Sequence, residues 1–212
     1  GDDGTALVMA VIFAAMLFTA GLSWKYILPV AAMIPPAAIV AWNFLLDDDK
    51  KNRILAVIDP TLVEAADSWQ QQRGLISIGN GGLWGNGVFM ETGQFRYVPE
   101  VYNDFIFTYI GETVGFIGCL AVLLVLAFLC IRILSNGLRA PDDLGKYICV
   151  GVFAMIGIQI IINIGMCLGM MPVIGVTLPF LSAGGTSTGT LYLAIGVVLS
   201  VYVHSGKDRL FG

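Results

Sequence analysis

The chain has 212 residues, of which 57% are hydrophobic and only 12% are charged. A soluble domain carries roughly 25% charged residues, so this chain has too few to cover a water-facing surface. Its net charge is −4, and it has no basic patch with interleaved aromatic residues, which excludes nucleic acid as a partner. The composition is that of a polytopic helical membrane protein that lies in the lipid bilayer.

Apolar runs predict five membrane spans, at residues 5–22, 26–46, 105–131, 147–170 and 188–203. A helix of about 20 apolar residues crosses roughly 30 Å of hydrocarbon. The predicted fold is therefore all-α. Residues 1–212 form a single integral membrane domain, a polytopic transmembrane helical bundle with a large irregular extracytoplasmic loop over residues 47–104.

Basic residues predict the orientation of the bundle. Arg132, Arg139 and Lys146 cluster between the third and fourth spans, and such connectors stay in the cytoplasm. Counting back across one span places Asp104 on the outer side. Counting forward places the Pro- and Gly-containing segment 172–185 there too. The two polar breaks in the chain are thus expected to share one face of the membrane.

Within the long loop, residues 62–79 are expected to form a short or re-entrant helix. Residues 79–87 follow and contain five glycines. They lack the G-x-G-x-x-G spacing, because Trp84 stands at the last glycine position. A row of backbone N–H groups would still cradle a pyrophosphate. The alternative interpretation is a simple bend in the chain.

Three carboxylates lie around the start of the third span. Asp104 stands where polar sequence becomes apolar, a costly place for a charge, so it is a functional candidate. The alternative is an ordinary helix N-cap. If the helix begins near Pro99, Glu100 and Asp104 lie one turn apart and Glu112 lies roughly 12 Å deeper than Asp104. Two carboxylates facing one cavity would do acid–base work, whereas Glu112 would otherwise pair with an Arg or Lys.

The last two spans contain polar residues of a different kind. Gln159 and Asn163 lie one helical turn apart, a spacing typical of amides that hold membrane helices together. Residues 182–187 begin the last span, where a helix N-terminus would receive an anion, or would only be capped. His204 is the only histidine, and the four cysteines form no CxxC pair, which argues against a zinc site or a His-based triad.

Taken together, these residues resemble the SEDS family of cell-wall polymerases, the relatives of RodA, FtsW and SpoVE. The resemblance covers essentially the whole chain, and its motifs occur in the family's order. The motifs are Asp3-Gly4-Thr5-Ala6, Gly21-Leu22-Ser23-Trp24, Asp59-Pro60, residues 79–87, Pro99-Glu100-x-x-x-Asp104-Phe105-Ile106-Phe107, Ile110-Gly111-Glu112, Asn163-Ile164-Gly165 and Leu178-Pro179-Phe180. Only the C-terminal part of the family is matched, which implies that the chain is truncated at its N-terminus.

The resemblance implies a peptidoglycan glycosyltransferase that joins lipid II disaccharides into glycan strands for elongation, division or sporulation. The site would lie on the extracytoplasmic face of the bacterial inner membrane, with a class B penicillin-binding protein as transpeptidase partner. Asp104 aligns with the family's essential aspartate. It would act as general base on the acceptor hydroxyl, or would organise that hydroxyl with a divalent cation, Mg or Mn. Predicted substrate-binding residues are Glu100, Glu112, Gln70, Arg73, Arg96, Gly81, Gly82, Ser182, Gly184 and Gly185.

The family's Tyr-Gln-x-x-Gln-Ser motif is altered here, because residues 69–74 read Trp-Gln-Gln-Gln-Arg-Gly. Two other classes of function stay open. Broken helices and intramembrane amides also suit a flippase or transporter of lipid-linked precursors. A truncated chain would also serve as an inactive scaffold. A full-length Asp104→Asn protein separates an enzyme from a transporter, since only the enzyme would lose polymerisation.

Overall fold

The computed structural model describes residues 3–59, 65–87, 98 and 100–211, so Arg96 and Pro99 lie outside the described residues. The described part is helical and contains no strand. Its elements in chain order are α1 (Asp3–Thr19), α2 (Trp24–Val40), the π-helical turn η1 (Ala41–Leu45), α3 (Asp48–Ile58), α4 (Ala65–Gly81), α5 (Ile106–Leu138), α6 (Asp143–Cys167) and α7 (Gly185–Phe211). The prediction of an all-α membrane bundle is confirmed.

Helices occupy all five predicted spans. By length and composition, four of them can cross a membrane: α2 continued by η1, α5, α6 and α7. The shorter α1 is apolar over 17 residues. Both α5 and α7 run beyond their predicted ends, to Leu138 and Phe211. Hydropathy marks where the hydrocarbon ends, whereas a helix continues into water until its backbone is interrupted.

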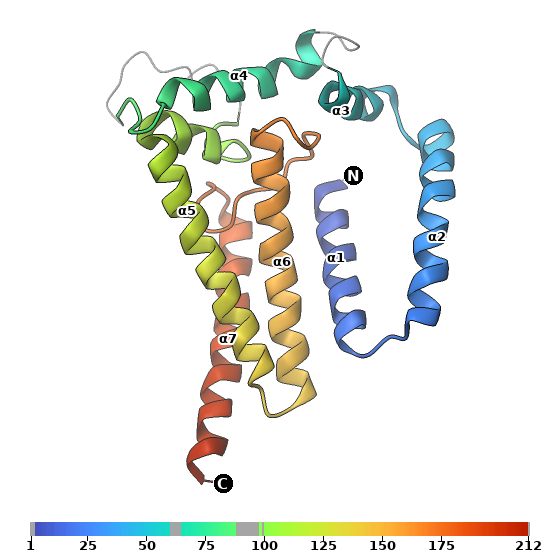
Figure 1. Ribbon diagram of the computed structural model, residues 1–212, viewed down its shortest axis with the longest axis vertical. Coiled ribbons are helices and arrows are strands. Elements are labelled where there is room, and N and C mark those ends of the chain that lie inside the picture. Colours follow the sequence, from blue (N-terminus) through green and yellow to red (C-terminus); the bar gives the residue numbers. More distant parts are fainter. Residues whose placement is uncertain (1–2, 60–64, 88–97, 99, 212) are drawn as a thin grey trace.

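The bundle is built around α6, which packs against α1 on one side and α5 on the other (Figure 1). Side chains from different elements are fully buried between them, among them Phe105, Ile156, Met166 and Leu178. Close packing of such side chains is what fixes helices relative to one another. In contrast, α2 contributes no buried residue and stands away from α6.

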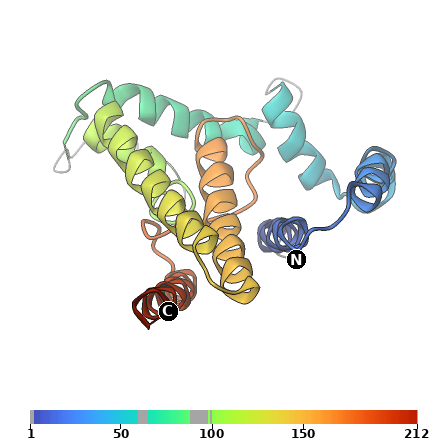
Figure 2. The same ribbon diagram turned by 60° about the horizontal axis from the view of Figure 1, so that its bottom comes forward.

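The long loop is more ordered than the sequence suggested. Two helices, α3 and α4, lie across one end of the bundle, and they do so in both ribbon views (Figures 1 and 2). The predicted helix at 62–79 is observed as α4, and it is not among the helices long and apolar enough to span a membrane. The expectation of irregular backbone is therefore wrong for residues 48–58 and 65–81.

Candidate functional site

Asp104 lies in a tight turn that precedes α5. The backbone carbonyl of Glu100 accepts hydrogen bonds from the N–H groups of Asn103 (2.9 Å) and Phe105 (3.3 Å), and Glu100 has φ 53°. This left-handed conformation is incompatible with a helix. The prediction that a helix begins near Pro99 and carries Glu100 and Asp104 on one face is therefore wrong, since α5 begins only at Ile106.

Three consecutive carbonyl groups of this turn are fixed by residues that follow much later in the chain. The N–H of Ala183 donates to the carbonyl of Tyr102 at 2.9 Å. The Oγ of Ser182 donates to the carbonyl of Asn103 at 2.6 Å, and Nδ2 of Asn163 donates to the carbonyl of Asp104 at 2.8 Å. Backbone groups of a loop are held in place when each has a hydrogen-bond partner, as these three carbonyls do. We call residues 100–105 the Asp104 turn.

Asn163 joins this turn to the segment between α6 and α7. Its Nδ2 also donates to the carbonyl of Val176 at 2.7 Å, and its side chain is fully buried. The prediction that Asn163 holds membrane elements together is confirmed. The expectation that the polar breaks at residues 100–105 and 172–185 share one end of the bundle is confirmed by the same contacts.

The Asp104 side chain is half-buried and lies beside Gly175. A Cβ at Gly175 would lie 3.5 Å from Asp104 Oδ2, so backbone approaches the carboxylate directly. Described side chains donate hydrogen bonds to Asp104 only at its backbone carbonyl, where the Cys167 thiol also lies at 3.7 Å. Burial raises the pKa of the Asp104 carboxyl, and the charge of Glu100 raises this pKa further. Such a carboxylate is poised to accept a proton.

Glu112 lies deeper, in α5, and is only 2% exposed. The hydroxyl of Ser77, from α4, donates a hydrogen bond to its Oε2. Gly81 packs in the same region, because a Cβ there would lie 1.9 Å from the carbonyl oxygen of Gly111. The contact between Ser77 and Glu112 therefore joins α4 to α5. In the structure Glu112 stands on α5 and Asp104 on the preceding turn, so the two carboxylates do not share a helical ridge.

The glycine-rich stretch after α4 fills a break in α5. Gly115 has φ 76° and ψ −169°, which interrupts the helix. At the break, backbone groups of the two segments pair with each other. The N–H groups of Asn86 and Gly87 donate to the carbonyls of Glu112 (2.9 Å) and Thr113 (3.0 Å).

In the opposite direction, the N–H groups of Phe116 and Ile117 donate to the carbonyls of Gly82 and Leu83. The N–H groups of Gly82 and Gly85 are bonded within the stretch itself. The N–H groups of Gly82, Gly85, Asn86 and Gly87 are thus bonded to backbone carbonyls, which gives this stretch a packing role; substrate binding through Gly81 and Gly82 stays a prediction. The simpler interpretation, a bend in the chain, is the one the structure supports.

The buried face of α4 is formed by Gln71, Gly74, Ser77 and Gly81. The sequence predicted a substrate-binding role for Gln70. In the structure, Nε2 of the neighbouring Gln71 donates hydrogen bonds to the carbonyls of Met166 (3.3 Å) and Met171 (2.7 Å). The spacing of three, three and four residues is that of one helical face, a signal that would have selected Gln71.

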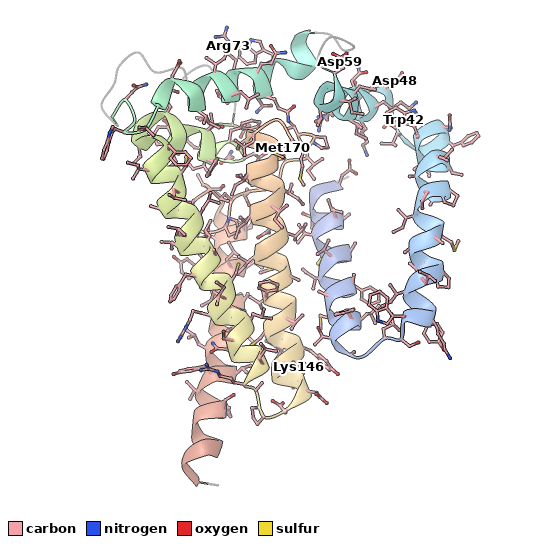
Figure 3. The ribbon with its side chains drawn as sticks, in the orientation of Figure 1. Trp42, Asp48, Asp59, Arg73, Lys146 and Met170 are labelled. Atoms are coloured by element: carbon pink, nitrogen blue, oxygen red, sulfur yellow. The ribbon has the colours of Figure 1, made fainter. Side chains whose placement is uncertain are left out.

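The remaining predicted residues lie on α4, around the start of α7 or outside the described residues. Arg73, on α4, lies over the ring of Trp69 at 5.6 Å, and Figure 3 shows it at the end of the bundle opposite Lys146. Gly184 and Gly185 stand at the start of α7, where the N–H of Gly184 donates to the carbonyl of Ser182. Ser182 accepts from the N–H of Leu178 and holds the Asp104 turn, so it does not cap α7. Arg96 lies outside the described residues.

The described residues include no group of three or more His, Cys, Asp or Glu side chains placed to hold a metal ion. Asp104 and Glu100 supply two carboxylates in one turn. Magnesium sites often use one or two carboxylates together with water and substrate phosphates. The donor set therefore fits a divalent cation that is shared with a phosphorylated substrate, and does not fit one held by protein ligands alone.

A family model described as cell cycle protein, for FtsW, RodA and SpoVE, matches residues 1–207. The peptidoglycan glycosyltransferase MrdB of Escherichia coli is 34% identical over 208 residues, 96% of this chain and 55% of that protein. Stage V sporulation protein E of Bacillus subtilis is 36% identical over 204 residues, again 96% of this chain and 55% of the relative.

A similar fold occurs in a chain of a solved peptidoglycan synthase complex, described in terms of the structural coordination of polymerization and crosslinking. It superposes with a TM-score of 0.80 at 27% identity, over 97% of this chain and 56% of that one. The chain therefore spans about half the length of the proteins it matches.

Proposed function

The chain belongs to the FtsW, RodA and SpoVE family, and we propose that it forms the catalytic part of a peptidoglycan glycosyltransferase with Asp104 as general base. One observation carries the assignment of the residue. The carboxylate is half-buried with a raised pKa, and it stands on a turn whose three carbonyls are bonded to residues of the bundle. A catalytic base needs both a suitable pKa and a fixed position.

The reaction that fits this site is glycosyl transfer between lipid-linked sugars. Asp104 would accept the proton of an acceptor sugar hydroxyl while that oxygen forms a bond to the anomeric carbon of the donor. The bond from the anomeric carbon to the diphosphate breaks, and lipid diphosphate leaves with the electron pair. With lipid II as donor, the product is a longer glycan strand and undecaprenyl diphosphate.

In the alternative form of the proposal, Asp104 and Glu100 would hold a magnesium or manganese ion, which would organise the acceptor hydroxyl. The protein itself supplies the remaining parts. The fixed turn directs the carboxylate, and the backbone of Gly175 closes one side of it. A fixed neighbouring wall limits the positions open to the reacting hydroxyl.

We also propose that this end of the bundle is extracytoplasmic and that a class B penicillin-binding protein is the partner. The Arg132–Lys146 connector lies at the other end of α5 and α6, as the cytoplasmic assignment of basic connectors requires. An Asn52→Cys variant on α3 tests the orientation. A membrane-impermeant maleimide should label it in intact cells. All four native cysteines are buried, so they provide little background. Labelling only after lysis would reverse the orientation.

The decisive experiment is polymerisation of purified lipid II by the full-length protein with Asp104→Asn. Removal of a general base typically costs 10²–10⁴-fold in rate, roughly 3–5 kcal/mol of transition-state stabilisation. Asp143→Asn, at the start of α6 on the opposite end, is the matched control and should polymerise normally. Unchanged glycan synthesis by Asp104→Asn would refute the assignment and favour a transporter.

A further inference from the structure

A cavity with charged residues in its wall lies at the same end of the bundle, on the segment that contacts Asp104. It has a volume of about 220 Å³ and is lined by Asp3, Leu46, Lys50, Arg53, Ile54, Pro172 and Ile174, the last two from the segment after α6. The wall therefore combines the first residue of α1, the end of η1 and one face of α3. We call it the Lys50–Arg53 pocket.

The pocket carries a positive charge. Its two cations and one carboxylate leave a net charge of +1, since 2 − 1 = 1. Lys50 Nζ lies 2.8 Å from Asp3 Oδ2, and this bridge is exposed to solvent, with 40% and 53% of the two side chains accessible. Exposed ion pairs contribute little to stability, so Lys50 can exchange Asp3 for a stronger anion at small cost.

Arg53 is held in place but keeps most of its donors. Its Nη1 donates to the carbonyl of Val173 at 3.1 Å, which is one of the five N–H bonds of a guanidinium. Arg side chains bind phosphate with two parallel N–H bonds.

The pocket is separated from Asp104 by a single stretch of backbone. Ile174 lines the Lys50–Arg53 pocket, and the next residue, Gly175, lies against Asp104 Oδ2. Consecutive Cα atoms are about 3.8 Å apart. An anion in the pocket and a sugar hydroxyl at Asp104 would therefore contact adjacent residues of one segment.

We propose that the Lys50–Arg53 pocket binds the diphosphate of a lipid-linked sugar or of the lipid diphosphate product. This inference rests on the proposed function, because it names a second subsite for the same reaction. The shared chemistry is a lipid-bound phosphate, which an anionic phospholipid headgroup also offers. The position on the wall shared with Asp104 favours the substrate, since a structural headgroup would need no contact with the Asp104 side.

Binding of undecaprenyl diphosphate to the full-length protein in phosphatidylcholine nanodiscs tests the proposal. Lys50→Gln and Arg53→Gln should each weaken binding about tenfold, as expected for loss of one charged hydrogen-bonding group. Lys51→Gln is the matched control, because Lys51 lies on the same helix but pairs with Asp48 at 3.6 Å and does not line the pocket. It should change binding less than twofold.

Three further arms make the result decisive. Arg53→Lys should retain part of the affinity, and thermal melting of each variant identifies loss of fold as a separate cause. Phosphatidylglycerol in the nanodiscs should compete weakly; full displacement of undecaprenyl diphosphate by it would assign the pocket to a headgroup and overturn the proposal. Equal binding by wild type, Lys50→Gln and Arg53→Gln would overturn it as well.

The Asp104→Asn variant separates this inference from the proposed function. It should bind undecaprenyl diphosphate as the wild type does while losing polymerisation. Normal polymerisation in Asp104→Asn together with weak binding in Arg53→Gln would refute the catalytic assignment and leave the pocket intact. The reverse combination would refute the pocket alone.

Discussion

The Asp104 turn and the glycine-rich stretch at residues 81–87 both looked like irregular, polar candidates for substrate binding, yet the structure uses them in opposite ways. In the turn, side chains of Asn163 and Ser182 bond to the backbone, and the half-buried carboxylate of Asp104 is left beside Gly175. In the glycine-rich stretch, backbone bonds to backbone across the break at Gly115.

The difference shows what marks a site in this fold. Glycines at residues 81–87 permit close approach of two chain segments, and in that approach the N–H groups of Gly82, Gly85, Asn86 and Gly87 bond to backbone carbonyls. In the Asp104 turn, the groups that accept hydrogen bonds are backbone carbonyls, so the carboxylate of Asp104 remains able to accept a proton. A functional site in this fold is therefore identified by the polar groups that packing leaves available to a ligand. The number of glycines in a segment does not predict which groups these are.

The largest expected effect tests the packing role of the glycine-rich stretch. Gly81→Ala would place a Cβ 1.9 Å from the carbonyl oxygen of Gly111, where backbone must shift, so we expect a loss of about 3 kcal/mol or more. Gly79→Ala, two residues earlier in α4, has open space around it and should stabilise by about 0.5–1 kcal/mol. Thermal melting and the yield of monodisperse protein measure both. Equal melting temperatures would contradict the packing role.

The second prediction concerns the side chain that fixes the Asp104 turn. Asn163→Ala leaves the carbonyls of Asp104 and Val176 without their donor, and each such loss costs about 1–3 kcal/mol. We expect a lower melting temperature and a larger loss of polymerisation than of fold. Gln159→Leu, one turn earlier, is the control. The Oε1 of Gln159 is buried without a hydrogen-bond partner in the described structure, so its removal should be neutral or stabilising.

Sequence patterns predicted the helices better than the site. Apolar runs located α1, α2, α5, α6 and α7, because hydrocarbon accepts only long apolar helices. The amide spacing at Asn163 and the shared face of the two polar breaks were also predictable, since both follow from periodicity and topology. The helices α3 and α4 were harder, because an interfacial helix is stabilised by what it packs against and α4 is not strongly apolar.

The contacts of individual site residues were not predictable from the sequence. Pro99 and the acidic spacing favoured a helix through Glu100, but the turn instead gives Glu100 a φ of 53°. That conformation depends on donors from residues 163–183, which lie far away in the chain. The hydrogen-bond partners of Ser182, Leu178 and Asn103, were not predictable for the same reason, since they are set by tertiary packing.

A smaller effect is expected at Ser182. Ser182→Ala removes one donated and one accepted hydrogen bond at a half-buried position where water can replace them, so the expected cost is about 1 kcal/mol. This corresponds to roughly a fivefold loss of activity if the turn moves. Ser182→Thr keeps the hydroxyl and should restore most of it. Polymerisation rates at saturating lipid II measure the difference, and a Thr variant as weak as Ala would argue against the hydroxyl.

The smallest expected effect is a shift in pH dependence, and it distinguishes a base from a structural carboxylate. Burial, and then Glu100, raises the pKa of Asp104, so the ionised base is lost as pH falls through that raised pKa. The rate should therefore rise with pH across this range. Glu100→Gln removes the like charge and retains an oxygen that can accept from Asn103, so the acid limb should move to lower pH.

The raised pKa of Asp104 makes stability and polymerisation rate change in opposite directions with pH. A carboxyl with a raised folded-state pKa costs stability above its unfolded-state pKa, and that cost disappears as pH falls below it. Asp104→Asn should therefore melt at the same temperature as the wild type or higher at neutral pH, although it loses polymerisation. A lower melting temperature would mean that the carboxylate is itself a structural ligand of the turn. The contrast with the glycine-rich stretch would then fail, because both segments would be serving the fold.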